Sequence, residues 1–426
     1  MKAPGALGES GMGGISRDLQ QPAWPRQPLN PASSHQEVMR FSDLPVALAI
    51  LVKPVVDGLY SMSSVKYGYM LFIFFAALFA LVGRMLSGMP GMHDAERRAY
   101  GRHAAIFAVY LSFLLILLAV YLGSLGEIFK IVSPFLVFLL LAPVVGPWTI
   151  KVVGLMCLAT IVGNGALLPF EQGWVYWGDV RTFKGFYYFK TDLAYALVFS
   201  TLGLAVWQRF RFTPILVAGI ALATAQVVLA NSRMNYLLFA VVVLFIAIKG
   251  GVKPWILVRN ATAVAGLGVL AAYLYDPTVL LGFDWFNEAR LTQGRNQIWE
   301  VLIEQGLMNF TLAEWLFGRG LYADVYLFAE NVSTGEAHNA HNEWLHLAIT
   351  QGLVGTLVYL GLWITIFDYL RARSLQPWAR WVALVGFGLL LLQSMTAVVS
   401  AFATKTWPLV FVLLAVACAR APEASK

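Results

Sequence analysis

The chain has 426 residues, of which 59% are hydrophobic and only 12% are charged. This balance excludes a soluble domain of this size and indicates an integral membrane protein. The formal net charge of +7 does not indicate a nucleic-acid partner, because the Lys and Arg residues stand singly or in small groups between apolar runs. The two cysteines, Cys157 and Cys418, lie inside apolar stretches, so we expect neither a disulfide nor a metal–thiolate site.

The two ends of the chain differ from its long apolar middle. Residues 1–43 are rich in Pro, Gly, Ser and Gln and hold no apolar run of the kind found in signal peptides. We therefore expect a disordered cytoplasmic tail over 1–43, one transmembrane domain over 44–420 and a second cytoplasmic tail over 421–426.

Apolar stretches recur along the chain after residue 43. Because a helix needs roughly 20 such residues to cross a bilayer, they predict an all-α fold, a polytopic transmembrane helix bundle with about 12 spans. The expected spans are 44–60, 69–86, 104–123, 131–147, 150–170, 192–207, 213–230, 234–249, 255–275, 345–367, 381–400 and 406–419.

The charged connectors predict the orientation of these spans, because cytoplasmic connectors retain Lys and Arg. With the N-terminus inside, every inside connector is basic. The residues concerned are Arg97, Arg98, Arg102, Lys151, Arg209, Arg211, Lys249, Lys253, Arg371, Arg373 and Arg380. Both termini are therefore predicted to face the cytoplasm.

Two predicted outside segments are longer than tight connectors, at 171–191 and at 276–343 between the ninth and tenth spans. Long loops of this kind are usually functional or form a small subdomain. Apolar residues in the second loop predict short amphipathic helices, at Trp299, Leu302 and Ile303 and at Trp315 and Leu316. These helices would lie either on the membrane surface or packed within the loop.

Basic residues also occur on the predicted outside face, at Arg181, Lys184, Lys190, Arg233, Arg290 and Arg295. Arg233 lies in a short connector, where the positive-inside tendency works against it, so we expect it to have a local role. One alternative is a snorkelling side chain that meets lipid phosphate. The other is a diphosphate headgroup site, because the planar guanidinium binds phosphate with two parallel hydrogen bonds that are less screened beside lipid.

Three histidines cluster at the predicted outside end of the tenth span, at His338, His341 and His346. They could be solvated surface residues. They could also bind a metal together with Glu336 or Glu343, although their spacing matches no established zinc pattern. We favour a general base, since a neutral imidazole can take a proton from a hydroxyl near neutral pH.

The third, fifth, seventh, eighth, eleventh and twelfth predicted spans have no ionisable side chain in their middles. Ion-coupled carriers usually need such groups to relay protons or cations. The sequence therefore places the candidate site at the rim of the membrane domain and weighs against a transporter.

Four motifs resemble the O-antigen ligase and O-antigen polymerase family of bacterial surface polysaccharide assembly. In chain order they are Arg181 with Gly-Phe-Tyr-Tyr-Phe-Lys at 185–190, Asn-Ser-Arg at 231–233, Gly-Arg-Asn-Gln-Ile-Trp at 294–299 with Gly-Arg-Gly at 318–320, and Ala-His-Asn-Glu-Trp-Leu at 340–345 with Gly352 and Gly355. Together with the large loop before the last spans, they cover roughly residues 178–370.

The resemblance implies a multispanning, metal-independent glycosyltransferase of the bacterial inner membrane without a cofactor. Such an enzyme takes a glycan from undecaprenyl diphosphate and passes it to a sugar hydroxyl at the periplasmic face. It would be a polymerase of O-antigen or exopolysaccharide, or a ligase that uses lipid A-core as acceptor. The implied partners are the lipid-linked glycan, the acceptor, membrane lipid and a chain-length regulator or other assembly proteins.

The resemblance also implies roles for individual residues. Arg181, Arg233 and Arg295 would bind the diphosphate, and His341 would activate or position the acceptor. The supporting residues would be Lys190, Asp192, His338 and Asn342. Where the family commonly has Lys-Asn or Pro-Asn, this chain has Lys190-Thr191-Asp192, so Asp192 could orient an arginine or bind a sugar hydroxyl. The rival functions are a transporter or flippase of lipid-linked saccharide and a non-catalytic scaffold.

Overall fold

The computed structural model describes residues 39–59, 62–87, 92–121, 124–177, 180–252, 295–331, 340–373, 377–398 and 403–418. These residues belong to one compact unit, Glu37–Ala421. The predicted N-terminal tail up to residue 38, the span predicted at 255–275 and the tail at 421–426 lie outside the described residues.

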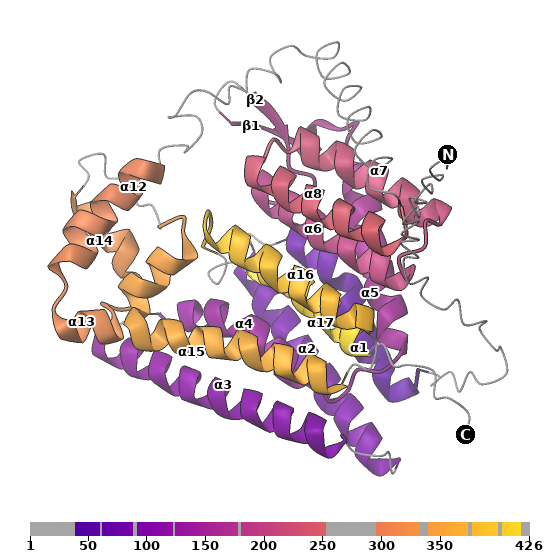
Figure 1. Cartoon of the computed structure of the whole chain (residues 1–426), viewed down its shortest axis with the longest axis horizontal. Coiled ribbons are helices and arrows are strands. Elements are labelled where there is room, and N and C mark those ends of the chain that lie inside the picture. Colours follow the sequence, from indigo (N-terminus) through magenta and orange to yellow (C-terminus); the bar gives the residue numbers. More distant parts are fainter. Residues whose placement is uncertain are drawn as a thin grey trace, which may run out of the picture. The chain divides into compact units, whose positions relative to one another are not determined.

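The described part of the chain is almost entirely helical (Figure 1). Its first helices are α1 (Leu44–Gly58), α2 (Ser63–Leu86), α3 (Asp94–Tyr121), α4 (Leu125–Leu141), α5 (Trp148–Gly165), α6 (Lys190–Trp207), α7 (Pro214–Leu229) and α8 (Arg233–Lys249). The later helices are α12 (Arg295–Val301), α13 (Leu312–Phe317), α14 (Ala323–Asn331), α15 (Glu343–Arg373), α16 (Pro377–Ser394) and α17 (Ala403–Ala417). Short 3-10 turns occur at Phe41–Asp43, Glu171–Gly173 and Leu307–Asn309, and a π-helical turn at Leu302–Gly306.

Each predicted span within the described residues falls on a helix, so the helical class is confirmed there. Among these residues, α2, α3, α5 and α15 are long and apolar enough to cross a membrane by themselves. Shorter apolar helices occur at Pro214–Leu229, Trp378–Ser394 and Thr406–Ala417. The total of about 12 spans stays a prediction from apolar stretch length.

Several helices extend beyond their predicted spans. Helix α3 begins at Asp94 and α15 ends at Arg373, whereas the apolar stretches run over 104–123 and 345–367. Hydropathy outlines only the part of a helix that is apolar. Charged turns can continue it, and the acidic residues Asp94 and Glu96 in the first turn of α3 suit the positive end of the helix dipole.

A small β-hairpin departs from the predicted all-α fold. Strand β1 (Trp174–Trp177) pairs antiparallel with β2 (Val180–Phe183), with Trp174 opposite Phe183 and Tyr176 opposite Arg181. The prediction treated 171–191 as a loop because it rested on apolar stretches long enough to span a membrane. The aromatic and β-branched residues of β1 favour extended backbone, and this local signal predicts a strand.

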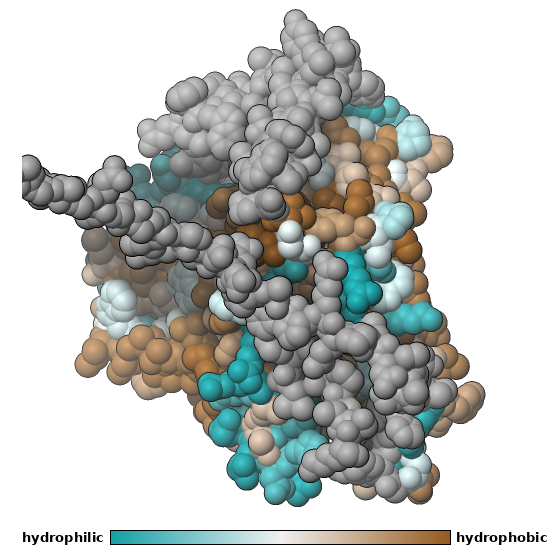
Figure 2. All heavy atoms as spheres, turned by 45° about the vertical axis from the view of Figure 1, so that its right-hand side comes forward, coloured by the Kyte–Doolittle hydropathy of each residue, from teal (hydrophilic) through white to brown (hydrophobic). Residues whose placement is uncertain are grey.

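Helix α6 is at the centre of the large hydrophobic core and packs against α5, α17, α8 and α7. It is buried on all sides from Asp192 to Val206, as expected of a helix that is apolar all round. By contrast, α2 and α3 expose large apolar side chains such as Phe75 and Ile116. Figure 2 shows broad hydrophobic areas on one face of the molecule, as expected of helices that meet lipid.

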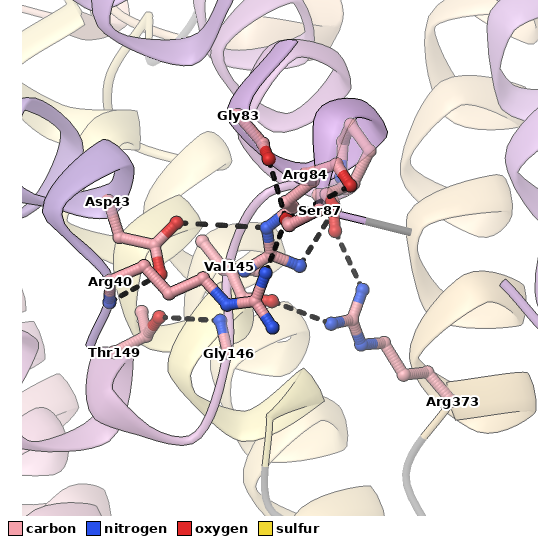
Figure 3. A network of polar contacts seen from close by, with 11 residues as sticks. Arg40, Asp43, Gly83, Arg84, Ser87, Val145, Gly146, Thr149 and Arg373 are labelled. Carbon is pink, nitrogen blue, oxygen red and sulfur yellow. Dashed lines mark hydrogen bonds and ion pairs between the residues drawn. The ribbon is translucent and has the colours of Figure 1, made fainter. Parts of the chain in front are cut away.

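Four segments assigned to the cytoplasmic side meet at one end of the helices (Figure 3). Nε of Arg84, at the end of α2, lies 3.7 Å from Oδ1 of Asp43, just before α1. Arg373, at the end of α15, donates to the carbonyls of Ala142 at 2.6 Å and Val145 at 2.8 Å, between α4 and α5. This grouping agrees with the alternating topology, while the side of the membrane stays a prediction.

The described parts of the predicted 276–343 loop contain short helices with their own hydrophobic cluster. Ile298 and Leu302 are buried against Leu327 and Phe328 of α14. Of the predicted residues, Leu302 is thus packed within the loop and Trp299 packs partly buried against the same cluster, whereas Ile303 is 38% exposed. Trp315 of α13 is 46% exposed, so contact with the membrane surface stays open for that helix.

Helix α15 is interrupted at Gly352, whose φ of 64° and ψ of −167° are not helical. The turn at 318–320 reaches this interruption, where the N–H of Arg319 donates to Ile349 O at 2.8 Å and that of Gly320 to Thr350 O at 3.1 Å. A Cβ at Gly352 would lie 2.5 Å from the carbonyl carbon of Leu316. The glycines of these two motifs therefore let the loop pack against α15.

Candidate active site

The hairpin presents Arg181 on strand β2. Its guanidinium is 4.7 Å above the ring of Trp174, and its Nη2 donates to Oε1 of Glu171 at 2.6 Å. The side chain of Glu171 is 82% exposed, and an ion pair with so exposed a partner is worth little. A phosphate group could therefore replace this carboxylate on Arg181.

The corner after the hairpin is held against α5. Gly185 has a φ of 58°, and a Cβ there would lie 2.2 Å from Oδ1 of Asn164. The same oxygen accepts a hydrogen bond from the N–H of Phe186 at 2.9 Å. This fixed corner determines where α6 begins and therefore where Lys190, its first residue, lies.

Lys190 and Arg233 are brought together at the starts of α6 and α8. The charge of Arg233 acts on the ammonium of Lys190. The two helix ends are linked by Asn235, whose Nδ2 donates to Ser232 Oγ at 2.8 Å and to Thr191 O at 3.5 Å. Because helix N-termini carry partial positive charge, two of them beside two cations form a favourable place for an anion.

Asp192, in the first turn of α6, is only 2% exposed. Its charge acts on the carboxyl of Asp57 in α1 and on Tyr187 in the corner. Its role, to orient an arginine or to bind a sugar hydroxyl, stays a prediction.

Arg295 is the first residue of α12, which belongs to the predicted 276–343 loop. Burial lowers the pKa of Arg295 from its usual value, although an arginine stays charged in proteins. One turn further, Nε1 of Trp299 donates to the carbonyl oxygen of Ala340 at 2.8 Å. Helix α12 therefore ties Arg295 to the segment that contains His341.

His341 lies in a short segment, residues 340–342, which we name the strap. Its φ of 47° is in the left-handed region, a conformation that costs about 1–3 kcal/mol for a residue other than glycine. The strap is held on its first side by the N–H of Ala340, which donates to Oδ2 of Asp324 at 3.0 Å. Such a conformation can occur at functional sites, and it also occurs at Arg209, Phe210 and Asn231, so the role of His341 stays a prediction.

Asn342 holds the strap on its other side. Its Oδ1 accepts from the N–H groups of Trp344 at 2.9 Å and Leu345 at 3.1 Å, at the start of α15. Its Nδ2 donates to Met395 O at 3.1 Å. Asn342 therefore caps α15 and anchors it to the turn after α16.

His346 does not face outward with His341. It is 6% exposed, and its Nδ1 lies 2.8 Å from Oδ2 of Asp324. His338 lies outside the described residues. The alternative of a metal held by all three histidines therefore stays untested.

Two further buried residues, Glu343 and Tyr195, stand close in sequence to the predicted site residues. Glu343, two residues after His341, acts electrostatically on the hydroxyl of Tyr195, which lies one turn beyond Asp192 in α6. Glu343 is 0% exposed and acts in the same way on His346. This interaction relates the start of α15 to α6, while the hydrogen bonds described above join the starts of α6 and α8, which carry Lys190 and Arg233, and join α12, which carries Arg295, to the strap.

The sequence did not single out Asp324 or Tyr195, and it did not predict that Glu343 is buried. Asp324 stands in a stretch with no motif of its own, and its contacts are 16 and 22 residues away along the chain. Glu343 belongs to the Ala-His-Asn-Glu-Trp-Leu motif, which was the available signal. Tyr195 had none, because aromatic residues are ordinary in apolar helices.

The fold and this site define a membrane protein of many helices, with arginines and a strained histidine near the ends of its helices. Residues 218–360 match the family described as O-Antigen ligase. The match supports assignment to the O-antigen ligase and polymerase family, as the motifs predicted. It includes Arg233, Arg295 and His341, whereas Arg181 and Lys190 precede it. No curated protein matches the chain.

Proposed function

We propose that this protein transfers a glycan from undecaprenyl diphosphate to a sugar hydroxyl at the periplasmic face of the bacterial inner membrane. The family match supports a ligase or polymerase that handles lipid-linked glycan. The observation that carries the proposal is the linkage of the starts of α6 and α8 through Asn235, which places Lys190 and Arg233 at neighbouring helix N-termini. Both termini would lie in the cytoplasm.

The donor would bind through its diphosphate. Arg181, Arg233 and Arg295 supply planar guanidinium groups, and Lys190 adds a charge beside Arg233. During transfer, the bond between the sugar and the phosphate oxygen breaks, and negative charge builds on the departing undecaprenyl diphosphate. Fixed cations stabilise this charge more in the transition state than in the ground state, which accelerates the reaction.

The acceptor hydroxyl would be activated by His341. The hydroxyl oxygen forms the new glycosidic bond, and its proton passes to the neutral imidazole. We expect this proton transfer to need no metal ion. The partly exposed position of His341 in the strap suits a group that must meet a second substrate.

The acceptor distinguishes the two forms of this activity. In a polymerase it is a glycan, and a chain-length regulator is the expected partner. In a ligase it is lipid A-core. Neighbouring genes separate them, because a flippase with a chain-length regulator favours a polymerase and a lipid A-core cluster favours a ligase.

Cells that lack the protein should accumulate lipid-linked glycan on the periplasmic face. A transferase acts after the donor has crossed the membrane, whereas a transporter or flippase acts before. The measurement is the fraction of accumulated donor that a membrane-impermeant lectin reaches in spheroplasts. We expect most of the donor to be reached. Donor that becomes accessible only after the membrane is opened would support the flippase alternative instead.

A further inference from the structure

One carboxylate oxygen contacts both the strap and helix α15. Oδ2 of Asp324, in α14, accepts from the N–H of Ala340 at 3.0 Å and lies 2.8 Å from Nδ1 of His346. Ala340 is the residue before His341, and His346 is in the first turns of α15. Asp324 therefore ties α14 to the strap and to α15 at the same atom.

Asp324 is 0% exposed, and a buried charge is retained only when it is paired and hydrogen-bonded. Burial alone would raise the pKa of Asp324, but His346 and the N–H groups of Ala340 and Val325 hold that pKa below its usual value. The carboxylate is therefore an anion whose partners are fixed. Since no part of it is exposed, it does not touch a substrate.

The strap needs such a constraint because of its conformation. His341 has a φ of 47°, in a region that only a few per cent of non-glycine residues adopt. The hydrogen bonds from Ala340 to Asp324 and from Asn342 to Met395 restrain the backbone on each side of it. Without the first of these bonds, the strap can relax and turn the imidazole away.

We infer that Asp324 is a positioning residue that holds His341 in the orientation required to take the acceptor's proton. The inference rests on the proposed function. His346 contributes indirectly, because it fixes the carboxylate that binds Ala340. Loss of Asp324 should therefore slow the chemical step more than donor binding, since Arg181 and Arg233 are on β2 and α8.

The test compares Asp324→Ala, Asp324→Asn and His346→Gln in purified protein supplied with undecaprenyl-diphosphate-linked glycan. Asp324→Ala should lower kcat by about 10²-fold, as expected for a misplaced catalytic group, while the KM for the donor stays near the wild-type value. Asp324→Asn keeps an oxygen that can accept both hydrogen bonds, so its loss should be smaller. His346→Gln should also be milder than Asp324→Ala, because the bond from Ala340 remains.

Hydrogen exchange supplies a readout that a general loss of structure would not reproduce. In Asp324→Ala the amide of Ala340 should exchange faster, while residues 353–373 of α15 stay protected. Glu314→Gln is the matched control. Glu314 pairs with Arg319 in the same part of the chain, at 2.7 Å, and is outside the strap. It should change neither kcat nor the exchange of Ala340.

Normal kcat in Asp324→Ala would overturn the inference. So would a fall in kcat that comes with loss of protection throughout α15. If Asp324→Ala does not fold, Asp324→Asn and His346→Gln decide, and normal kcat in both would overturn it. Inactivity of the wild-type protein would instead contradict the proposed function. In that case, unchanged hydrogen exchange of the Ala340 amide in the variants would show separately that Asp324 does not hold the strap.

Discussion

Replacement of His341 by alanine should lower the rate of glycan transfer by a factor of about 10² to 10⁴, the usual contribution of a general base. Cells with this variant should accumulate lipid-linked donor and lose polymer or ligated product at normal protein levels. The measurement is the amount of donor and of product in extracted lipid and polysaccharide. The strap histidine is the sharpest candidate because it combines a family motif, a strained backbone and partial exposure.

Two further variants separate chemistry from backbone effects. Asparagine tolerates the left-handed region better than most residues, so His341→Asn should fit the strap and still lack the base. It should be as inactive as His341→Ala. His93→Ala is the control, since His93 is exposed just before α3, at the predicted cytoplasmic end, and it should be fully active. Normal transfer by His341→Asn and His341→Ala would show that His341 is not the base.

Replacement of Arg233 by lysine should impair transfer at least about tenfold, although the positive charge is kept. The planar fork that binds two phosphate oxygens is lost, and a lysine at such a site is not an equivalent residue. Arg233→Ala should be worse, because removal of one stabilising donor commonly costs about 10²- to 10³-fold in kcat. The measurement is the initial rate of transfer in membranes with matched amounts of inserted protein.

Arg211→Lys is the matched control for this change. Arg211 lies between α6 and α7, at the opposite end of α6 from Lys190, and is exposed. It is assigned to the cytoplasmic face, and its replacement should have no effect on transfer. Full activity in both Arg233→Lys and Arg233→Ala would favour the snorkelling alternative, in which the arginine meets only lipid phosphate.

Hydropathy predicted the helices well because burial in a bilayer or in a helical core selects the same apolar residues. It predicted their ends less well, as at Asp94, where charged turns continue a helix outside its apolar part. It also missed the hairpin at 174–183, because four-residue strands are too short to appear among apolar stretches of membrane-spanning length. The break at Gly352 was equally hidden, since its cause is the contact with residues 316–320.

The candidate site was predictable where motifs carried it and not where it depends on distant contacts. Arg233 and His341 stand in recognisable sequences, and the positive-inside tendency set Arg233 apart. The hydrogen bonds of Asp324 to Ala340 and His346 depend on how α14 packs against the start of α15. No local pattern in the sequence reports such packing, so this residue needed the structure.

The central claim is tested most directly by the purified protein in liposomes with undecaprenyl-diphosphate-linked glycan and a suitable acceptor. The quantity to measure is the release of undecaprenyl diphosphate together with the formation of the extended or ligated glycan, with and without a metal chelator. We predict equal release in both conditions, matched to the product formed. No release from active-site-intact protein, or activity abolished by the chelator and restored by zinc, would contradict a metal-independent transferase.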